Sequence, residues 1–350
     1  MQGKNNGLSV SFEKIITMIL VFVGLFFPFI DIRYFESFQF PTAAAEDIFI
    51  WSREFPQTDF SVSSIRLGEI RSDGPRRDTI PPIHDPKFVL AKDVTNMGGL
   101  EPVLSVAIGG ELRAYPLRIL LWHEIVNDNV GDVPILVSFC PLCNSGVVFD
   151  RRIDGKTLDF GNTGRIRHFD MIMYDMETES WWQQFTGEAI VGSLTGKKLS
   201  VIPARLESLD RFQSRGDQAL LLVPNNLDVR PYGTSPFAGT DGARVASERY
   251  PYPIPADLTP FDRVVVIGRD AWPLKVLRKK GELQFKDLVI TWSPGQNSLH
   301  DKKRISEGRD VGNIIVRRRA ESGFSEVPYD VTFAFAFSAF IADGRFHAGK

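Results

Sequence analysis

Two segments of this 350-residue chain recur later in it, in the same order and at nearly the same spacing. Residues 114–120 read AYPLRIL and reappear at 271–277 as AWPLKVL. Residues 137–145 read VSFCPLCNS and align with ITWSPGQNS at 290–298. Two ordered matches of this kind indicate a duplicated unit. We therefore expect two related halves, each containing a strand, a helix, a strand, a tight turn and a further strand.

The local pattern predicts an α+β fold that is rich in strands. Pro116 is well placed to begin a helix, because its missing N–H is not needed in the first turn. Apolar residues on almost every side of this helix, to about Asn127, predict that it is buried. Asp154-Gly155 is a strong hairpin signal. We expect strands at 103–108, 133–139, 146–153, 156–160, 171–174 and 181–185, and a further short helix at 206–212.

Composition divides the chain into four parts. We predict an N-terminal tail with a membrane anchor or signal segment at 1–45, a first half at 46–223, a connection at 224–260 and a second half at 261–350. Seven prolines lie in the connection, which indicates irregular structure. The second half is expected to be degenerate, because Ser293 and Gln296 stand where the first half has its two cysteines. Any chemistry is therefore expected in the first half.

The N-terminal segment predicts a location outside the cytoplasm. Residues 15–30 are apolar except for Thr17, and Lys4 and Lys14 precede them, a charge pattern that leaves the N-terminus inside. Sixteen residues lie between a signal-peptide core and a full span of about 20. We expect an anchor or a cleaved signal, with a buried core helix as the alternative. The membrane is thus the expected partner, through residues 15–30, and the body is expected to be periplasmic or extracellular.

Nucleic acid is not an expected partner. The 41 Lys and Arg residues are balanced by 43 Asp and Glu residues, which gives a net charge of −2. A protein that binds nucleic acid through its phosphates needs a basic surface. With only two cysteines, the chain also lacks the ligands for a four-thiolate metal site or an iron–sulfur cluster.

Those two cysteines form the motif Cys140-Pro141-Leu142-Cys143, for which three interpretations remain open. The residues after Cys143 have the pattern of a strand, which favours a turn between two strands. In thioredoxin-like proteins the motif lies instead at the start of a helix. Such a turn would present two thiolates to Cu or Zn. Alternatively, the pair serves a thiol-dependent enzyme or redox protein. The third interpretation is a structural interaction module with a disulfide.

Additional ligands or catalytic groups must come from elsewhere in the chain. His123 and Glu124 interrupt the apolar helix, and a buried carboxylate there must be paired, neutral or ligating. Met173 lies in a polar segment at 165–175, and a thioether beside thiolates would favour Cu(I). The predicted metal ligands are Cys140, Cys143, His123 and Met173, and the catalytic candidates are Cys140, His123 and Glu124. No other cofactor is expected.

Five strings in order carry a resemblance to a known family. They are AYPLRILLWHEIVND, SFCPLCNS, VVFDRRIDGKTLDFGN, MYDMETESWWQQ and GEAIVG, and they resemble the domain-of-unknown-function family numbered 3179. The resemblance runs from about Pro81 to the C-terminus and is densest in the first half. It implies a duplicated, exported or membrane-anchored protein and brings no established activity. Asn144 departs from the family pattern, which usually has Gly there.

Overall fold

The computed structural model describes residues 45–348, apart from 73, 228, 242 and 244–249. Strands make up most of its regular structure, and its helices are short. This confirms the expected β-rich class. Within the described residues, no helix is long and apolar enough to cross a membrane. The apolar segment at 15–30, on which the anchor prediction depends, lies outside them.

The first sheet of the N-terminal half is built around a hairpin. It comprises β2 (Lys87–Leu90), β3 (Pro102–Ile108), β4 (Glu111–Pro116), β15 (Arg205–Ser208) and β16 (Leu220–Val223). The strand order is β15-β3-β4-β16-β2, with β16 parallel to β4. A short helix, α4 (Leu209–Gln213), follows β15. The helix predicted at 206–212 was placed too early, because the first of those residues pair with β3 as a strand.

Helix α3 (Leu117–His123) begins directly after Pro116, as predicted, but it is shorter than expected. Glu124 adopts the left-handed conformation with φ of 57°, and its backbone N–H bonds back into the last turn. This arrangement ends a helix. The chain then continues as β5 (Ile125–Val130). The prediction that the helix reaches Asn127 was therefore wrong, and Asn127 lies on a strand.

The second sheet of this half contains the cysteine motif, in the turn that joins its two central strands. It comprises β5, β6 (Val133–Cys140), β7 (Ser145–Asp150) and β14 (Ser200–Ile202), in the order β14-β7-β6-β5. Helix α3 packs against strands of both sheets, which explains why it is apolar on nearly all sides. The hairpin predicted at Asp154-Gly155 is present, with positive φ at both residues, between β8 (Arg152–Ile153) and β9 (Lys156–Thr157).

A third sheet completes the N-terminal half. It comprises β1 (Ile70–Arg71), β10 (Phe160–Arg167), β11 (Asp170–Asp175), β12 (Trp181–Gln183) and β13 (Glu188–Val191), in that order. Helix α2 (Ala45–Glu54) packs on this sheet through aromatic side chains of Trp51, Phe55, Tyr174 and Trp181. Within the described residues, the C-terminal half has no counterpart of this sheet. The third sheet therefore distinguishes the N-terminal half from the described part of the C-terminal half.

The described residues of the C-terminal half form two four-stranded sheets, two short α-helices and a single-turn 3-10 helix at Ile305–Glu307. The first sheet, β23-β17-β18-β24, comprises β17 (Arg263–Ile267), β18 (Asp270–Pro273), β23 (Asp330–Phe333) and β24 (Arg345–Phe346). The second, β19-β20-β21-β22, comprises β19 (Glu282–Phe285), β20 (Leu288–Ser293), β21 (Asn313–Ala320) and β22 (Gly323–Glu326). Helix α5 (Leu274–Lys280) follows β18, and α6 (Ala334–Phe340) follows β23.

The order of these elements parallels that of the N-terminal half. The series β17-β18-α5-β19-β20-β21 runs like β3-β4-α3-β5-β6-β7, and Pro273 precedes α5 as Pro116 precedes α3. The later elements β23-α6-β24 take the positions that β15-α4-β16 take in the other half, with the same antiparallel and parallel pairings. Superposition of the two halves, at 102–160 and 262–320, stays a prediction.

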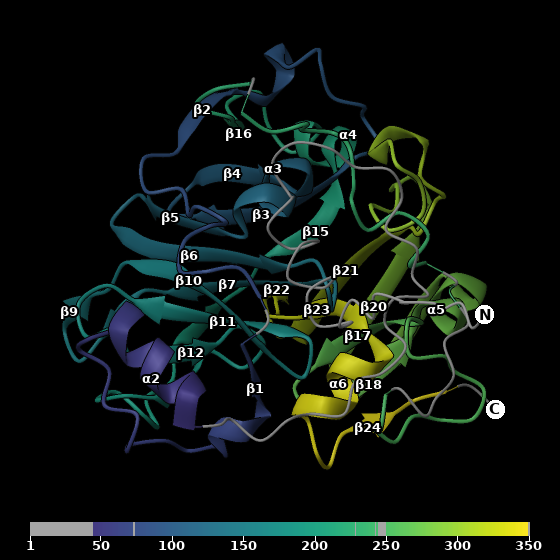
Figure 1. The fold of residues 1–350 in the computed structure, drawn as a ribbon. Helices are drawn as coiled ribbons and strands as arrows, with labels where there is room; N and C mark the ends of the chain where they lie inside the picture. Colours follow the sequence, from purple (N-terminus) through teal and green to yellow (C-terminus); the bar gives the residue numbers. More distant parts are fainter. Residues whose placement is uncertain (1–44, 73, 228, 242, 244–249, 349–350) are drawn as a thin grey trace, which may run out of the picture.

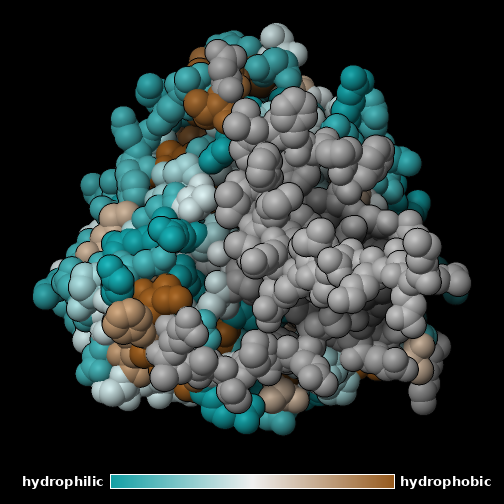
Figure 2. All heavy atoms as spheres, in the orientation of Figure 1, coloured by the Kyte–Doolittle hydropathy of each residue, from teal (hydrophilic) through white to brown (hydrophobic). Residues whose placement is uncertain are grey.

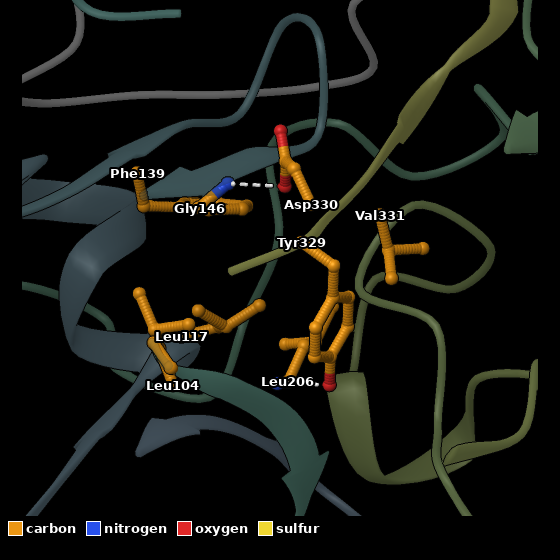
Figure 3. Close-up of a pocket in the computed structure, with 9 residues that line it drawn as sticks. Leu104, Leu117, Phe139, Gly146, Leu206, Tyr329, Asp330 and Val331 are labelled. Carbon is orange, nitrogen blue, oxygen red and sulfur yellow. Dashed lines mark hydrogen bonds between the residues drawn. The ribbon is translucent and has the colours of Figure 1, made fainter. Parts of the chain in front are cut away.

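The two halves pack against each other in a reciprocal manner. Strand β23 lies against β7, and β15 lies against β21; in Figure 1 the second half occupies the green to yellow side of the molecule. A small cavity lies where they meet (Figure 3), lined by Leu104, Leu117, Phe139, Gly146, Ala204, Leu206, Tyr329, Asp330 and Val331. The Tyr329 hydroxyl donates to the carbonyl of Ile314 and accepts from the backbone N–H of Leu206. The core is therefore continuous across the two halves.

The connection between the halves is irregular, as predicted. Its described residues at 224–260 contain no helix, and their one strand-like contact is an isolated bridge at Thr234. The described surface on the face shown in Figure 2 is mainly hydrophilic, with apolar side chains gathered over α2. Phe49 and Ile50 of this helix are 62% and 44% exposed.

Candidate metal centre

The Cys-x-x-Cys segment is a tight turn between two antiparallel strands. Cys140 is the last residue of β6, and Ser145 is the first residue of β7. Asn144 has a φ of 53°, in the left-handed region that Asn adopts more readily than most residues. The predicted turn is confirmed. Because a strand follows the second cysteine, this motif differs from one in which a helix N-terminus lowers the pKa of the first thiol.

A second turn brings a carboxylate to the thiols. His168 and Phe169 join β10 to β11 with φ values of 52° and 64°. Two successive positive-φ residues are typical of the type I′ hairpin turn, although an aromatic residue is unusual in that conformation. The carbonyl oxygen of Phe169 lies 3.7 Å from Cys140 Sγ. Asp170, the next residue, is thereby placed beside both cysteines.

Two thiols and one carboxylate converge at this point. The Sγ atoms of Cys140 and Cys143 and an oxygen of Asp170 all lie within 4.8 Å of one another. The distance from Cys143 Sγ to Asp170 Oδ1 is 3.1 Å. All three residues are at least 99% buried, and both cysteines are free thiols. In the part of the chain that the structure describes, no other group of His, Cys, Asp or Glu side chains is arranged in this way.

The second oxygen of Asp170 is held by its own partners. Asp170 Oδ2 accepts hydrogen bonds from Gln183 Nε2 at 2.6 Å and from the backbone N–H of Phe185 at 2.9 Å. Such bonds fix a carboxylate's orientation and leave its other oxygen for a ligand. Oδ1 is thus directed at Cys143.

Burial decides the protonation of the thiols. It raises the pKa of Cys140 above the ordinary range of a thiol, and the negative charge of Asp170 adds to this rise. Burial likewise raises the pKa of Cys143 well above that range. In the absence of a metal, both cysteines are therefore protonated at neutral pH.

Burial and hydrogen bonds act on the pKa of Asp170 in opposite directions. Desolvation raises its pKa to about 6, although the bonds from Cys143 and Gln183 favour the charged form. At neutral pH the site therefore consists of two neutral thiols and one carboxylate. A metal ion would displace the two thiol protons, because the thiolate is the ligand.

Glu124 lies nearby as a neutral acid. It is 8% exposed, and burial raises its pKa to about 8, with the charge of Asp170 as a further cause. Its Oε2 accepts a hydrogen bond from Asn162 Nδ2 at 2.5 Å. A carboxyl group that stays protonated at pH 7 is not available as the general base that the sequence suggested.

His123 is directed to a different part of the molecule. Its Nδ1 lies 2.8 Å from the carbonyl oxygen of Pro81, and its Nε2 lies 2.8 Å from the hydroxyl of Tyr232, whose ring stacks on it. Both ring nitrogens are thus engaged, and His123 does not belong to the group of converging ligands. The geometry does not support its predicted role as a ligand.

Met173 shares the apolar core around the thiols. It lies on β11 opposite Trp182 and is fully buried in the same cluster as both cysteines. Its role as a thioether ligand stays a prediction. Asp175, the last residue of the same strand, accepts hydrogen bonds from Trp182 Nε1 and from Thr178, and so stabilises the turn that follows β11.

Sequence reasoning did not select Asp170 or its partner Gln183. Asp170 lies in the polar segment at 165–175, but nothing in that segment distinguishes it from its neighbours. The positive-φ turn at His168 and Phe169 determines which residue faces the thiols. A hairpin signal was absent, because the turn lacks the Asn-Gly or Asp-Gly pair that usually marks this conformation.

Comparison with known proteins identifies one family. The sequence model of the family described as "Protein of unknown function (DUF3179)" matches residues 77–344, a range that includes every member of the thiol–carboxylate group. No curated protein and no solved structure matches the chain.

Proposed function

We propose that this chain, which belongs to the DUF3179 family, binds a soft metal ion through Cys140, Cys143 and Asp170. The observation that carries the proposal is the convergence of two thiols and a carboxylate within 4.8 Å inside an apolar core. Burying a carboxylate and two polar sulfur groups in such a core is unfavourable unless they have partners. A bound Zn(II) would serve as the common partner of the three groups and would offset two of the three negative charges that two thiolates and a carboxylate carry.

The third ligand bears on the identity of the metal. With Met173 or His123 as third ligand, the thiolates would suit Cu(I) or Zn(II). A carboxylate oxygen is a harder ligand, and Zn(II) commonly combines it with Cys sulfur. Asp170 therefore favours Zn(II) over Cu(I) as the physiological ion.

Nucleophilic thiol chemistry fits the same geometry less well. A nucleophile needs an ionised thiol that a substrate can reach. Cys140 and Cys143 are 1% and 0% exposed, and burial raises the pKa of both. Glu124 is neutral and His123 is engaged by Pro81 and Tyr232. This leaves the Asp170 carboxylate, which already accepts hydrogen bonds from Cys143 and Gln183, as the base beside the thiols.

The test is the metal content of protein purified under reducing conditions. Elemental analysis and competition with a chromophoric chelator would be applied to the parent and to Cys140→Ser, Cys143→Ser and Asp170→Asn. We expect about one Zn(II) per parent chain, loss of metal retention in both cysteine variants, and weaker retention in Asp170→Asn. Serine has nearly the volume of cysteine, so the fold should survive.

Asp175→Asn is the matched control. Asp175 is a fully buried aspartate on the same strand as Asp170, but it lies outside the converging group. It should keep the metal. Equal metal retention in the parent and in both cysteine variants would refute the proposal. A metal-free parent whose thiols react rapidly with an alkylating agent would favour a thiol enzyme. A metal-free parent that forms a Cys140–Cys143 disulfide once the reductant is removed would favour the structural module.

Two broader proposals follow from the sequence. We propose that residues 15–30 anchor the chain to a membrane with the metal centre outside the cytoplasm; the exposed apolar residues of α2, which begins shortly after that segment, support this placement. We also propose that the two halves arose by duplication. The matching order of strands in the two halves supports a common origin. Membrane fractionation tests the first proposal, and superposition of the halves tests the second.

A further inference from the structure

The C-terminal half contacts the backbone of the cysteine turn at several consecutive positions. The carbonyl of Cys143 accepts two hydrogen bonds, from Thr332 Oγ1 at 2.7 Å and from the backbone N–H of Phe333 at 3.0 Å. The carbonyl of Pro141 is 2.7 Å from His300 Nε2. Because these partners belong to β23 and to the segment before β21, the turn that carries the ligands is held by the other half of the molecule.

The rest of the turn is held in the same way. Asn144 Nδ2 donates to the carbonyl of Val331 at 2.6 Å. Asp330 accepts hydrogen bonds from Ser145 Oγ at 2.6 Å and from the backbone N–H of Gly146 at 3.1 Å, a contact visible in Figure 3. Strand β23 therefore follows the turn residue by residue.

His300 is itself held in a buried polar network. It is fully buried, and its Nδ1 lies 3.3 Å from Arg263 Nη2, whose guanidinium pairs with Asp241. A carbonyl can only accept a hydrogen bond, so Nε2 carries the proton and Nδ1 accepts from Arg263. Burial lowers the pKa of His300 to about 4, which is consistent with this neutral form. The ring is fixed as a donor to Pro141.

These contacts reach the peptide groups of the turn and the side chains of Asn144 and Ser145, and none of them is made to a sulfur atom. We propose that the C-terminal half preorganises the metal site, with Thr332 and His300 as positioning residues that set the orientation of the cysteine sulfurs. The inference rests on the proposed metal binding. Groups that orient ligands in this way change metal affinity by roughly 10- to 100-fold when removed.

The turn at 293–298 of the C-terminal half aligns with the cysteine turn in sequence, and both halves hold it. The backbone N–H of Asn297 donates to the carbonyl of Leu100 in the N-terminal half. Asp310 of the C-terminal half accepts hydrogen bonds from the backbone N–H groups of Gly295, Gln296 and Gly312. A carboxylate from within the half thus stabilises a turn that has no cysteine. The turn with the thiols is tied to the C-terminal half through the carbonyl groups of Pro141 and Cys143 and, through Asp330, at the backbone N–H of Gly146.

Thr332→Val tests the proposal, because valine keeps the shape of threonine and removes the hydroxyl. Cys143 retains its bond from Phe333, so the fold should persist. With Zn(II) in chelator competition, we expect affinity to fall roughly 10- to 100-fold. Thr332→Ser restores the hydroxyl and should restore affinity. With Co(II) as a spectroscopic probe, the ligand-field bands should shift in Thr332→Val and return in Thr332→Ser.

Thr163→Val is the matched control. Thr163 is also fully buried, and its hydroxyl donates to a backbone carbonyl, that of Ile172, at 2.6 Å. It should lose thermal stability as Thr332→Val does but keep the affinity and Co(II) spectrum of the parent. Unchanged affinity and spectrum in Thr332→Val, with a parent that binds metal, would overturn the positioning role alone. A parent that binds neither Zn(II) nor Co(II) would overturn the proposed function and this inference together.

Discussion

Glu124 should make the metal-free protein less stable as the pH rises. Its carboxyl group has a pKa of about 8 in the fold, against an ordinary value of 4.5, because it is buried. Between these two values the folded chain holds a proton at Glu124 that the unfolded chain has released. The free energy of unfolding therefore decreases with increasing pH in this window. For one proton the slope is about 1.4 kcal/mol per pH unit.

Glu124→Gln removes this contribution and preserves most of the contacts. The amide oxygen of Gln can accept the hydrogen bond from Asn162 that Glu124 accepts. From pH 5 to pH 7, the parent should lose about 3 kcal/mol through this group, whereas the variant should lose none of it. Asp170 and Asp330, whose burial raises their pKa to about 6 and about 7, titrate in both proteins and cancel in the comparison.

Denaturant unfolding of chelator-treated protein at pH 5, 6 and 7 measures the difference. The stability of Glu124→Gln relative to the parent should increase by about 1.4 kcal/mol per pH unit. Glu188→Gln is the control, because the Glu188 side chain is 47% exposed; its stability relative to the parent should not vary in this way. Parallel pH profiles for Glu124→Gln and the parent would show that Glu124 is ionised in the fold or titrates equally in the unfolded chain.

Three further predictions concern protons and packing. Zn(II) affinity, measured by chelator competition, should rise about 100-fold from pH 7 to pH 8, because Cys140 and Cys143 each release a proton; a rise below tenfold would contradict buried neutral thiols. Gly164→Ala should lower the melting temperature markedly, since Gly164 has φ of 74° and an added Cβ would meet the backbone of residues 75–76. Asp241→Asn should remove stability that is present above about pH 4 and lost as the pH falls towards 2, because Arg263 holds the pKa of Asp241 at about 2; unchanged acid unfolding would be the contrary result.

Local chemistry explains which parts of the site could be predicted. The start of α3 follows from the fixed φ of Pro116, and the turn at Asn144 follows from the tolerance of Asn for positive φ. The end of α3 was missed because Glu124, a residue with no strong preference for the left-handed conformation, adopts it there.

Long-range pairing explains what could not be predicted. Asp170 reaches Cys143 across 27 residues of sequence, through a turn at His168 and Phe169 with no standard signal. We predicted His123 as a ligand because it lies shortly before the cysteines in the sequence. Its ring instead contacts Pro81 and Tyr232, which are 42 and 109 residues away. Helical and hairpin periodicities specify single elements, whereas the ligand set depends on how separate elements pack.

The hydrogen bond from Thr332 to the carbonyl of Cys143 also bears on the state of the turn while the chain is being synthesised. The two residues are 189 positions apart, so a ribosome that adds 5–20 residues per second needs about 10 to 40 s to travel from one to the other. Throughout that interval the growing chain already contains Cys140 and Cys143 but not the strand that covers their turn. The turn therefore lacks its bonds from Thr332 and Phe333 during that interval, so its two cysteines are held less firmly in the growing chain than in the completed one.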